Sequence, residues 1–173
     1  MIELELTYLA KYIPRELDWK NFKEIVDIYV PNGTNHLTLR LRKSGDKYEL
    51  TKKEPLKGKD SSIQLEQTIP LKEEEYMTLA KLKGRLIRKK RYYYTYMDQP
   101  VEIDIFQDNL KRLVLIDFEF KTKKEKDSFK MPHFCMADIT QEKFIAGGVL
   151  CGKTYKELEK DLKKWGYKKI VTK

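Results

Sequence analysis

The sequence has no long apolar run, and only two of its 173 residues are cysteines. A helix that spans a bilayer needs about 20 consecutive apolar residues, and charged residues interrupt this chain far more often than that. Charges begin at Glu3, so the N-terminus does not resemble a secretory signal peptide. Cys135 and Cys151 do not have the spacing of metal ligands. We therefore expect a cytoplasmic protein with reduced thiols and no membrane partner.

The length and charge suggest one domain, residues 1–173, with an anionic partner. The chain is long enough for a single hydrophobic core and too short for two ordinary domains. Its net charge of +9 favours nucleic acid, a membrane surface or a small polyanion. Much of the excess lies in the lysine-rich segments 121–126 and 160–173, which are typical of solvated surface. Charge alone does not choose among these partners.

Five predicted strands each carry two like charges that are two residues apart. The pairs are Glu3 and Glu5, Arg40 and Arg42, Lys89 and Arg91, Glu102 and Asp104, and Asp117 and Glu119. In a strand the members of such a pair share one face and lie about 7 Å apart. The opposite face is apolar in most of these strands and must be buried, so the charged faces are either solvated or line a common lumen. A lumen that holds divalent cations and a polyphosphate needs clustered carboxylates for the cations and Arg or Lys for the phosphates.

Turn residues between the apolar segments predict about eight strands. The expected strands are 2–12, 25–30, 37–43, 48–53, 63–69, 86–96, 101–107 and 112–121. Most connections are short enough for hairpins, which implies an antiparallel sheet. Helical spacing predicts helices at 72–83 and 153–164, with Pro70 ending the strand before the first of them. Residues 16–22 are expected to form a short helix or an irregular crossing.

Residues 147–154, GGVLCGKT, match the phosphate-binding pattern G-x-x-x-x-G-K-[ST] letter for letter. Such a loop opens a parallel sheet, in which each further βαβ unit takes about 30 residues. Only nineteen residues follow Thr154, and the connections before it are too short for parallel crossovers. We therefore interpret Gly147, Gly148 and Gly152 as turn and helix-start glycines, and Lys153 with Thr154 as the first turn of a surface helix.

The order of the charged pairs resembles that of the CYTH family, the triphosphate tunnel metalloenzymes. The similarity covers nearly the whole chain, through E-x-E in the first strand, LRLRKSGDKYELTKK, KKRYYYT, VEIDIF, LIDFEF and ADITQEKFIAGG. It implies an α+β fold, an eight-stranded antiparallel closed β-barrel with a few covering helices. The charged lumen of this barrel would bind a triphosphate with Mg²⁺ or Mn²⁺. Members of the family include inorganic triphosphatases, thiamine triphosphatases and class IV adenylate cyclases.

The resemblance also implies a role for individual residues. The implied metal ligands are Glu3, Glu5, Glu66, Asp117 and Glu119. The implied phosphate ligands are Arg40, Arg42, Lys53, Lys89, Arg91 and Lys143. The implied catalytic residues are Glu5, Glu102, Asp104 and Lys89. Lys53 is preferred to Lys52 because it shares the strand face of Glu49 and Thr51.

One position departs from the family pattern E-x-E-x-K, because its fifth place is occupied here by Thr7. Lys11 has the same strand parity but lies about 13 Å further along the strand. The implied activity is metal-dependent hydrolysis of inorganic triphosphate or an organic triphosphate. A non-catalytic polyphosphate or nucleotide-binding module stays open because of Thr7, and so does a class IV adenylate cyclase, although no purine pocket is recognisable. Nucleic acid is not expected, since the tyrosines of 92–96 alternate between strand faces instead of forming one stacking surface.

Overall fold

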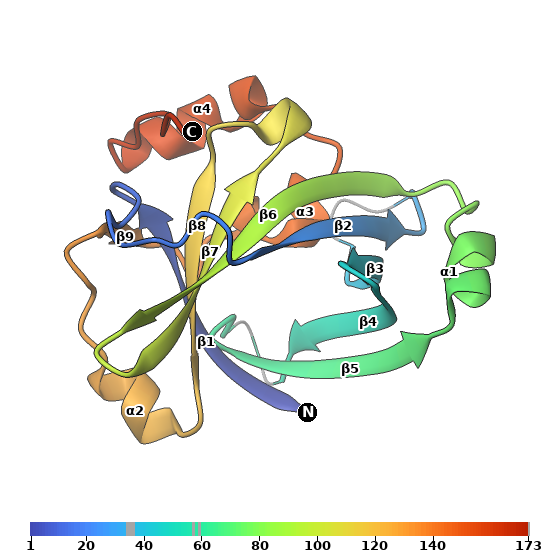
Figure 1. Cartoon of the computed structure of the whole chain (residues 1–173), viewed down its shortest axis with the longest axis horizontal. Coiled ribbons are helices and arrows are strands. Elements are labelled where there is room, and N and C mark those ends of the chain that lie inside the picture. Colours follow the sequence, from blue (N-terminus) through green and yellow to red (C-terminus); the bar gives the residue numbers. More distant parts are fainter. Residues whose placement is uncertain (34–36, 57, 59, 173) are drawn as a thin grey trace.

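The computed structural model describes residues 1–33, 37–56, 58 and 60–172, and its central feature is a closed antiparallel β-barrel (Figure 1). Its strands are β1 (Ile2–Ala10), β2 (Phe22–Val30), β3 (Leu39–Ser44), β4 (Lys47–Pro55), β5 (Ile63–Leu71), β6 (Arg85–Tyr96), β7 (Gln99–Phe106), β8 (Val114–Phe120) and β9 (Cys135–Asp138). They pair in the order β5-β4-β3-β2-β6-β7-β8-β1-β9, and β1 pairs in addition with β5. This last pairing closes the first eight strands into the predicted barrel, with β9 as a short addition beside β1.

Period-two alternation explains which side chains fill the core and which face the lumen. Ile103 of β7 and Ile116 and Phe118 of β8 are 0% exposed, and they pack outside the barrel wall against Phe134. Their neighbours in sequence, such as Asp117, must then point into the barrel. The apolar face of each strand thus holds the wall in place while the charged face lines the lumen.

The helices cover the barrel at its ends and along one side. They are α1 (Glu73–Leu79), α2 (Lys123–Ser128), α3 (Gly147–Leu150) and α4 (Tyr155–Lys164), with short 3₁₀ turns η1 (Asp108–Leu110) and η2 (Lys143–Ile145). α4 lies above β7 and β8 in Figure 1, where Leu158 and Leu162 pack into the same core cluster as Leu110. None of the helices in the described residues is both long and apolar enough to cross a membrane.

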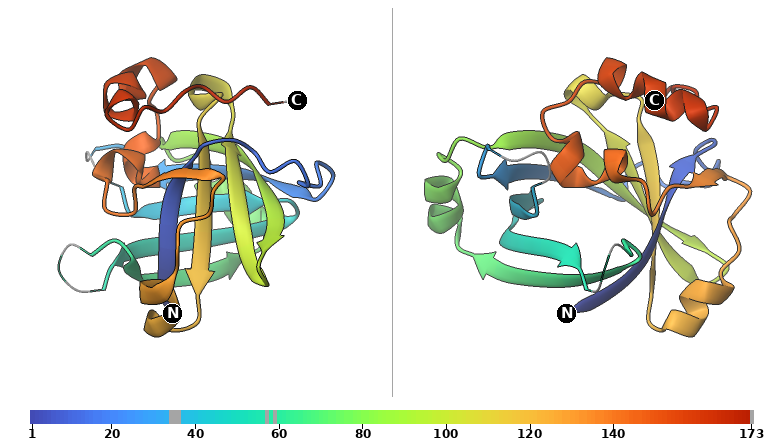
Figure 2. Two further views of the ribbon diagram at one scale, coloured as in Figure 1. Left: turned by 90° about the vertical axis from the view of Figure 1, so that its left-hand side faces the viewer. Right: turned by 180° about the vertical axis from the view of Figure 1, so that it is seen from behind.

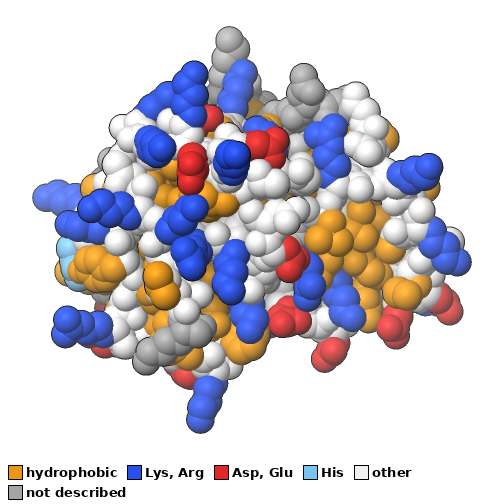
Figure 3. All heavy atoms as spheres, turned by 90° about the horizontal axis from the view of Figure 1, so that it is seen from above, with side chains coloured by type: hydrophobic (Ala, Val, Ile, Leu, Met, Phe, Trp, Pro, Cys, Tyr) orange, Lys and Arg blue, Asp and Glu red, His pale blue; other side chains and the backbone are white. Residues whose placement is uncertain are grey.

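The basic excess lies largely on the outer surface, as expected from the sequence. Lys156, Lys160 and Lys163 of α4 are exposed. The face seen from above in Figure 3 carries many Lys and Arg side chains with fewer acidic groups between them. Cys135 and Cys151 are free and buried, and burial raises the pKa of the Cys135 thiol to about 12.

Some predicted boundaries are wrong. Pro70 does not end its strand but lies within β5, where it pairs with Glu49 of β4. On its other side β5 pairs with β1 only at Ile63–Leu65, so Pro70 occupies an edge position at which a missing N–H group costs no ladder bond. The helix predicted at 72–83 is shorter. Residues 16–21 form turns and irregular backbone, the second of the two predicted alternatives.

The phosphate-loop pattern at 147–154 does not have the structure of such a loop. All strand pairings are antiparallel, and the last helix begins at Tyr155 with Thr154 as its N-cap, whose hydroxyl accepts a hydrogen bond from the backbone N–H of Glu157. Gly147 and Gly148 begin α3, and Gly152 lies in the turn after it, which agrees with their interpretation as turn and helix-start glycines.

Candidate active site

A cavity of about 280 Å³ occupies the lumen of the barrel. Every residue assigned to metal, phosphate or catalysis from the sequence lines it. These residues are Glu3, Glu5, Arg40, Arg42, Lys53, Glu66, Lys89, Arg91, Glu102, Asp104, Asp117, Glu119 and Lys143. The structure therefore brings together charges that are spread over seven strands and the covering segment at η2.

The register between β1, β7 and β8 sets carboxylates directly opposite one another. Glu5 stands opposite Glu119, and Glu102 stands opposite Asp117. Like charges in such positions destabilise a sheet. Partial burial and the nearby carboxylates of Glu102 and Glu3 raise the pKa of Glu119 to about 7. Burial, followed by the charges of Asp104 and Glu5, raises the pKa of Asp117 to about 7.

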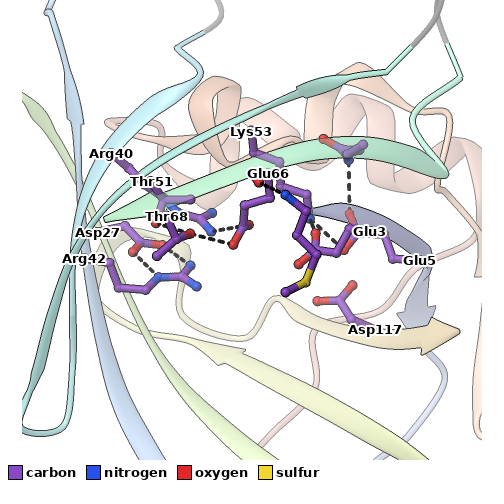
Figure 4. A network of polar contacts seen from close by, with 12 residues as sticks. Glu3, Glu5, Asp27, Arg40, Arg42, Thr51, Lys53, Glu66, Thr68 and Asp117 are labelled. Carbon is purple, nitrogen blue, oxygen red and sulfur yellow. Dashed lines mark hydrogen bonds and ion pairs between the residues drawn. The ribbon is translucent and has the colours of Figure 1, made fainter. Parts of the chain in front are cut away.

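Only a few cationic side chains offset this group of carboxylates. The Lys53 ammonium lies 2.5 Å from Glu3 Oε2 and 2.8 Å from Glu5 Oε2, and Gln64 donates a hydrogen bond to Glu5 Oε1 at 3.1 Å (Figure 4). Glu3 Oε2 is buried, and besides this ion pair it has no hydrogen-bond partner among the described residues. The acidic side of the lumen therefore keeps a surplus of negative charge.

This surplus fits a hard divalent cation, which prefers carboxylate oxygens. Glu3, Glu5 and Glu119 would hold it. Within the described residues no three carboxylate, His or Cys side chains already stand in metal-ligand geometry, and Glu3 and Glu5 contact the Lys53 ammonium. The observation that supports a metal is the set of opposed carboxylates, which a cation would relieve.

The opposite side of the lumen is basic and centres on a buried aspartate that the sequence analysis missed. Asp27 of β2 is 2% exposed, and the Arg42 guanidinium donates Nε to its Oδ1 and Nη2 to its Oδ2, both at 2.7 Å. Burial opposes the charged form, but Arg42 outweighs it and holds the pKa of Asp27 well below its usual range. A single acid inside the apolar stretch IVDIYV, residues 25–30, is the signal that could have identified it.

Arg40 neighbours this pair. Its Nη1 donates to the Tyr29 hydroxyl at 3.4 Å, its Nη2 lies 3.6 Å from Glu66, and its buried Nε has no hydrogen-bond partner in the described parts of the chain. Glu66 thus lies beside arginine on the basic side (Figure 4), away from the opposed carboxylates proposed for the cation.

A second arginine is held in the same way between the two sides. Arg91 Nε and Nη2 donate to the two oxygens of Asp104, each at 2.7 Å. Lys89 forms a further ion pair with Asp104, and Glu102 forms one with Arg91 Nη1. Asp104 is 1% exposed, so both of its oxygens are committed to cationic side chains. Burial lowers the pKa of Lys89 despite this contact.

Thr7, the departure from the family pattern, is buried and hydrogen-bonded. Its hydroxyl donates to Asp117 Oδ1 at 2.7 Å, and its backbone N–H donates to the Thr140 hydroxyl at 3.0 Å. Lys11 is exposed beyond the end of β1 and does not line the cavity, as its spacing predicted. The position that bears a lysine in the family pattern therefore supplies a neutral donor to a carboxylate.

The segment with η2 and α3 covers one end of the barrel (Figure 2, right) and contributes Lys143, Gly147 and Gly148 to the lining. A Cβ atom on Gly147 would lie 2.0 Å from the Tyr29 hydroxyl, and one on Gly148 would lie 1.7 Å from the carbonyl oxygen of Leu37. The two glycines therefore allow α3 to approach β2 and the segment before β3.

The chain is similar to known proteins in sequence and in structure, although no family model matches it. An inorganic triphosphatase of Nitrosomonas europaea is 29% identical over 118 residues, which are 66% of this chain and 75% of the relative. The crystal structure of an inorganic triphosphatase has a TM-score of 0.61 at 24% identity and covers 86% of this chain and 93% of its own. A putative adenylate cyclase from Bacillus halodurans has a TM-score of 0.57 at 13% identity over 99% and 93% of the two chains.

The motif order along the strands, the closed barrel with its charged lumen and the triphosphatase relative agree with one another. Together they are consistent with the resemblance to the CYTH family, the triphosphate tunnel metalloenzymes, that the sequence motifs indicate.

Proposed function

We propose that this protein hydrolyses inorganic triphosphate, or an organic triphosphate, with the aid of Mg²⁺ or Mn²⁺ inside the barrel. The observation that carries the proposal is the division of one lumen into a side with opposed carboxylates, Glu5 with Glu119, and a side with arginine donors, Arg40 and Arg42. A triphosphate with its divalent cation has the matching charges. The similarity to an inorganic triphosphatase supports the same reaction.

Phosphoryl transfer depends mainly on positioning and charge neutralisation. Arg40, Arg42 and Arg91 would bind phosphate oxygens, each guanidinium being able to contact two of them. Lys53 and Lys89 would add single positive charges, and Lys143 would contact the substrate from the covering segment. These donors would stabilise the charge that develops on the transferred phosphoryl group.

The carboxylates have separate tasks in this proposal. Glu3, Glu5 and Glu119 would hold the cation, which would supply positive charge for phosphate oxygens and lower the pKa of a water. Asp117, whose pKa is raised, and Glu102 opposite it would accept a proton from the attacking water. Asp104 contacts Arg91 and Lys89 with both oxygens, so we assign it to positioning these cations.

The direct test is phosphate release from tripolyphosphate, ATP and thiamine triphosphate, each with Mg²⁺, Mn²⁺ or a chelator. We expect release that requires a metal and is fastest with tripolyphosphate. Formation of a cyclic nucleotide from ATP would favour the cyclase alternative. Tight binding of all three without release of phosphate would favour a binding module.

Two variants connect the activity to the lumen. Arg42→Ala removes a charge-assisted phosphate contact and should weaken substrate binding by about 2–3 kcal/mol, or roughly 30- to 150-fold. Lys153→Ala is the control, because Lys153 belongs to the phosphate-loop pattern but does not line the cavity. A loss of a hundredfold or more in Lys153→Ala would contradict the assignment of the site to the lumen.

A further inference from the structure

Two arginines in the lumen are held by buried aspartates through the same geometry. Asp27 stands directly opposite Arg42 between β2 and β3, and Asp104 stands directly opposite Arg91 between β6 and β7. In each pair Nε and Nη2 donate to the two carboxylate oxygens, and all four distances are 2.7 Å. The two pairs form from four different strands, so their likeness comes from register and not from local sequence.

The two arginines differ in which of their guanidinium N–H groups remain without an acceptor among the described residues. A guanidinium has five N–H groups, and an aspartate held through Nε and Nη2 uses two of them. The outer edge of Arg91 is engaged by Glu102 through Nη1. The outer edge of Arg42 contacts no acceptor among the residues that the structure describes.

A neighbouring donor also lacks an acceptor. Arg40 Nε is buried without a hydrogen-bond partner in the described part of the chain, and Arg40 lies beside the Asp27–Arg42 pair in Figure 4. Buried donors are nearly always satisfied, so this corner of the lumen calls for an acceptor that the described residues do not provide. An anionic ligand in the lumen would supply it.

We propose that Asp27 is a positioning residue that holds one edge of the Arg42 guanidinium, so that the outer edge faces the lumen as a fixed two-pronged donor for a substrate phosphate group. The proposal deepens the triphosphate function above and rests on it. Asp27 itself never touches the substrate. Its benefit is that the arginine is ordered before binding, which lowers the entropy lost when the phosphate binds.

This role makes a prediction opposite to that of simple charge counting. Asp27 is an anion near the binding site of another anion, so its removal should tighten substrate binding if only the net charge of the lumen matters. If Asp27 orients Arg42, its removal should weaken binding even though the lumen becomes more positive. The sign of the change distinguishes the two.

The experiment measures calorimetric binding of tripolyphosphate in the presence of a chelator, so that neither metal nor turnover contributes. We expect Asp27→Asn to weaken binding by about tenfold or more, because the amide of nearly identical shape can no longer accept two hydrogen bonds from Arg42. Glu24→Gln is the matched comparison. It also removes a carboxylate of β2, but Glu24 is exposed and does not line the cavity, so binding should stay unchanged.

Arg42→Lys provides the second test. In this variant the buried Asp27 carboxylate still has a cationic partner. The lysine keeps the positive charge and the ion pair with Asp27, so the melting temperature should change little. A single ammonium cannot contact Asp27 along one edge and present a second edge to phosphate. We therefore expect about a tenfold loss of tripolyphosphate affinity without a matching loss of stability, which a merely structural role of the pair would not produce.

The possible results distinguish a failure of the positioning role from a failure of the proposed function. Unchanged or tighter binding by Asp27→Asn, or wild-type affinity in Arg42→Lys, would overturn the positioning role, and Arg42→Lys decides alone if Asp27→Asn does not fold. Absence of tripolyphosphate binding by the wild-type protein would instead contradict the proposed function itself.

Discussion

The side chain at position 7 controls the charge beside Asp117. Thr7 stands directly opposite Asp117, so a lysine placed there would have its ammonium within reach of that carboxylate. We expect Thr7→Lys to raise kcat for inorganic triphosphate with a smaller effect on KM, because the other lumen cations already hold the ground state. Steady-state kinetics at saturating Mg²⁺ or Mn²⁺ tests this. A lower or unchanged kcat, together with a higher metal requirement, would show that the lysine displaces the cation.

Glu119 and Glu5 face each other across β1 and β8, and a bound cation would relieve their repulsion. Glu119→Gln should therefore stabilise the metal-free protein by up to about 1 kcal/mol. It should also abolish most of the activity. Added Mg²⁺ at a hundred times its dissociation constant should stabilise the wild-type protein by about 2.7 kcal/mol, and the variant should lose most of this stabilisation. Urea unfolding with Mg²⁺ and with chelator measures both effects.

The control for this variant is Glu24→Gln, which removes an exposed carboxylate of β2 that does not line the cavity. It should change neither the metal-free stability nor the response to Mg²⁺. A Glu119→Gln protein that behaves like this control would show that Glu119 belongs to an ordinary solvated face.

At the scale of elements, the cover formed by α3 depends on Gly148. An alanine there would place Cβ 1.7 Å from the carbonyl oxygen of Leu37, which is backbone and cannot move aside easily. We expect Gly148→Ala to destabilise the protein by about 1–3 kcal/mol through overpacking and to weaken tripolyphosphate binding as the cover with Lys143 is displaced. Chemical unfolding and calorimetry measure the two effects. Gly33→Ala is the control, because no atom lies within 4 Å of the added Cβ; equal behaviour of the two variants would exclude a tight cover.

The elements also show where sequence patterns predict well and where they fail. Alternation placed Glu102 and Asp104 of β7 on the lumen face, because a strand allows only two faces. It did not foresee that Pro70 continues β5, since that depends on which side of the strand is paired. The pattern GGVLCGKT matched a phosphate loop by its letters, while its first two glycines serve the contact of α3 with Tyr29 and Leu37.

For the whole molecule, the lumen makes the stability of the metal-free protein depend on pH. Asp117 and Glu119 have folded-state pKa values of about 7, above their values of about 4 in an unfolded chain. The folded state therefore binds more protons between these pH values, and its stability falls as the pH rises from about 5 to 8. Asp27 and Asp104 have lowered pKa values, so their contribution is present above about pH 4 and is lost below it.

We expect maximal stability of the metal-free protein near pH 5 and a decrease on the order of 2 kcal/mol by pH 8. Urea unfolding across this range in chelator tests the expectation. Asp117→Asn should flatten the decrease, and Mg²⁺ should restore stability at pH 8. A free energy of unfolding that rises steadily from pH 5 to 8 would contradict the raised pKa values of Asp117 and Glu119.

The local sequence was sufficient to predict antiparallel strands and the charged side chains that share a strand face, because both follow from the period of two and from short connections. The closed barrel and its lumen were implied by the resemblance to the CYTH family, which rests on the order of the charged pairs. The tertiary structure alone decided the partners of these side chains, because register between strands far apart in sequence sets Asp27 against Arg42 and Glu5 against Glu119. The same holds for the close approach of α3 to Leu37, since an interatomic distance across the fold leaves no periodic trace in the sequence.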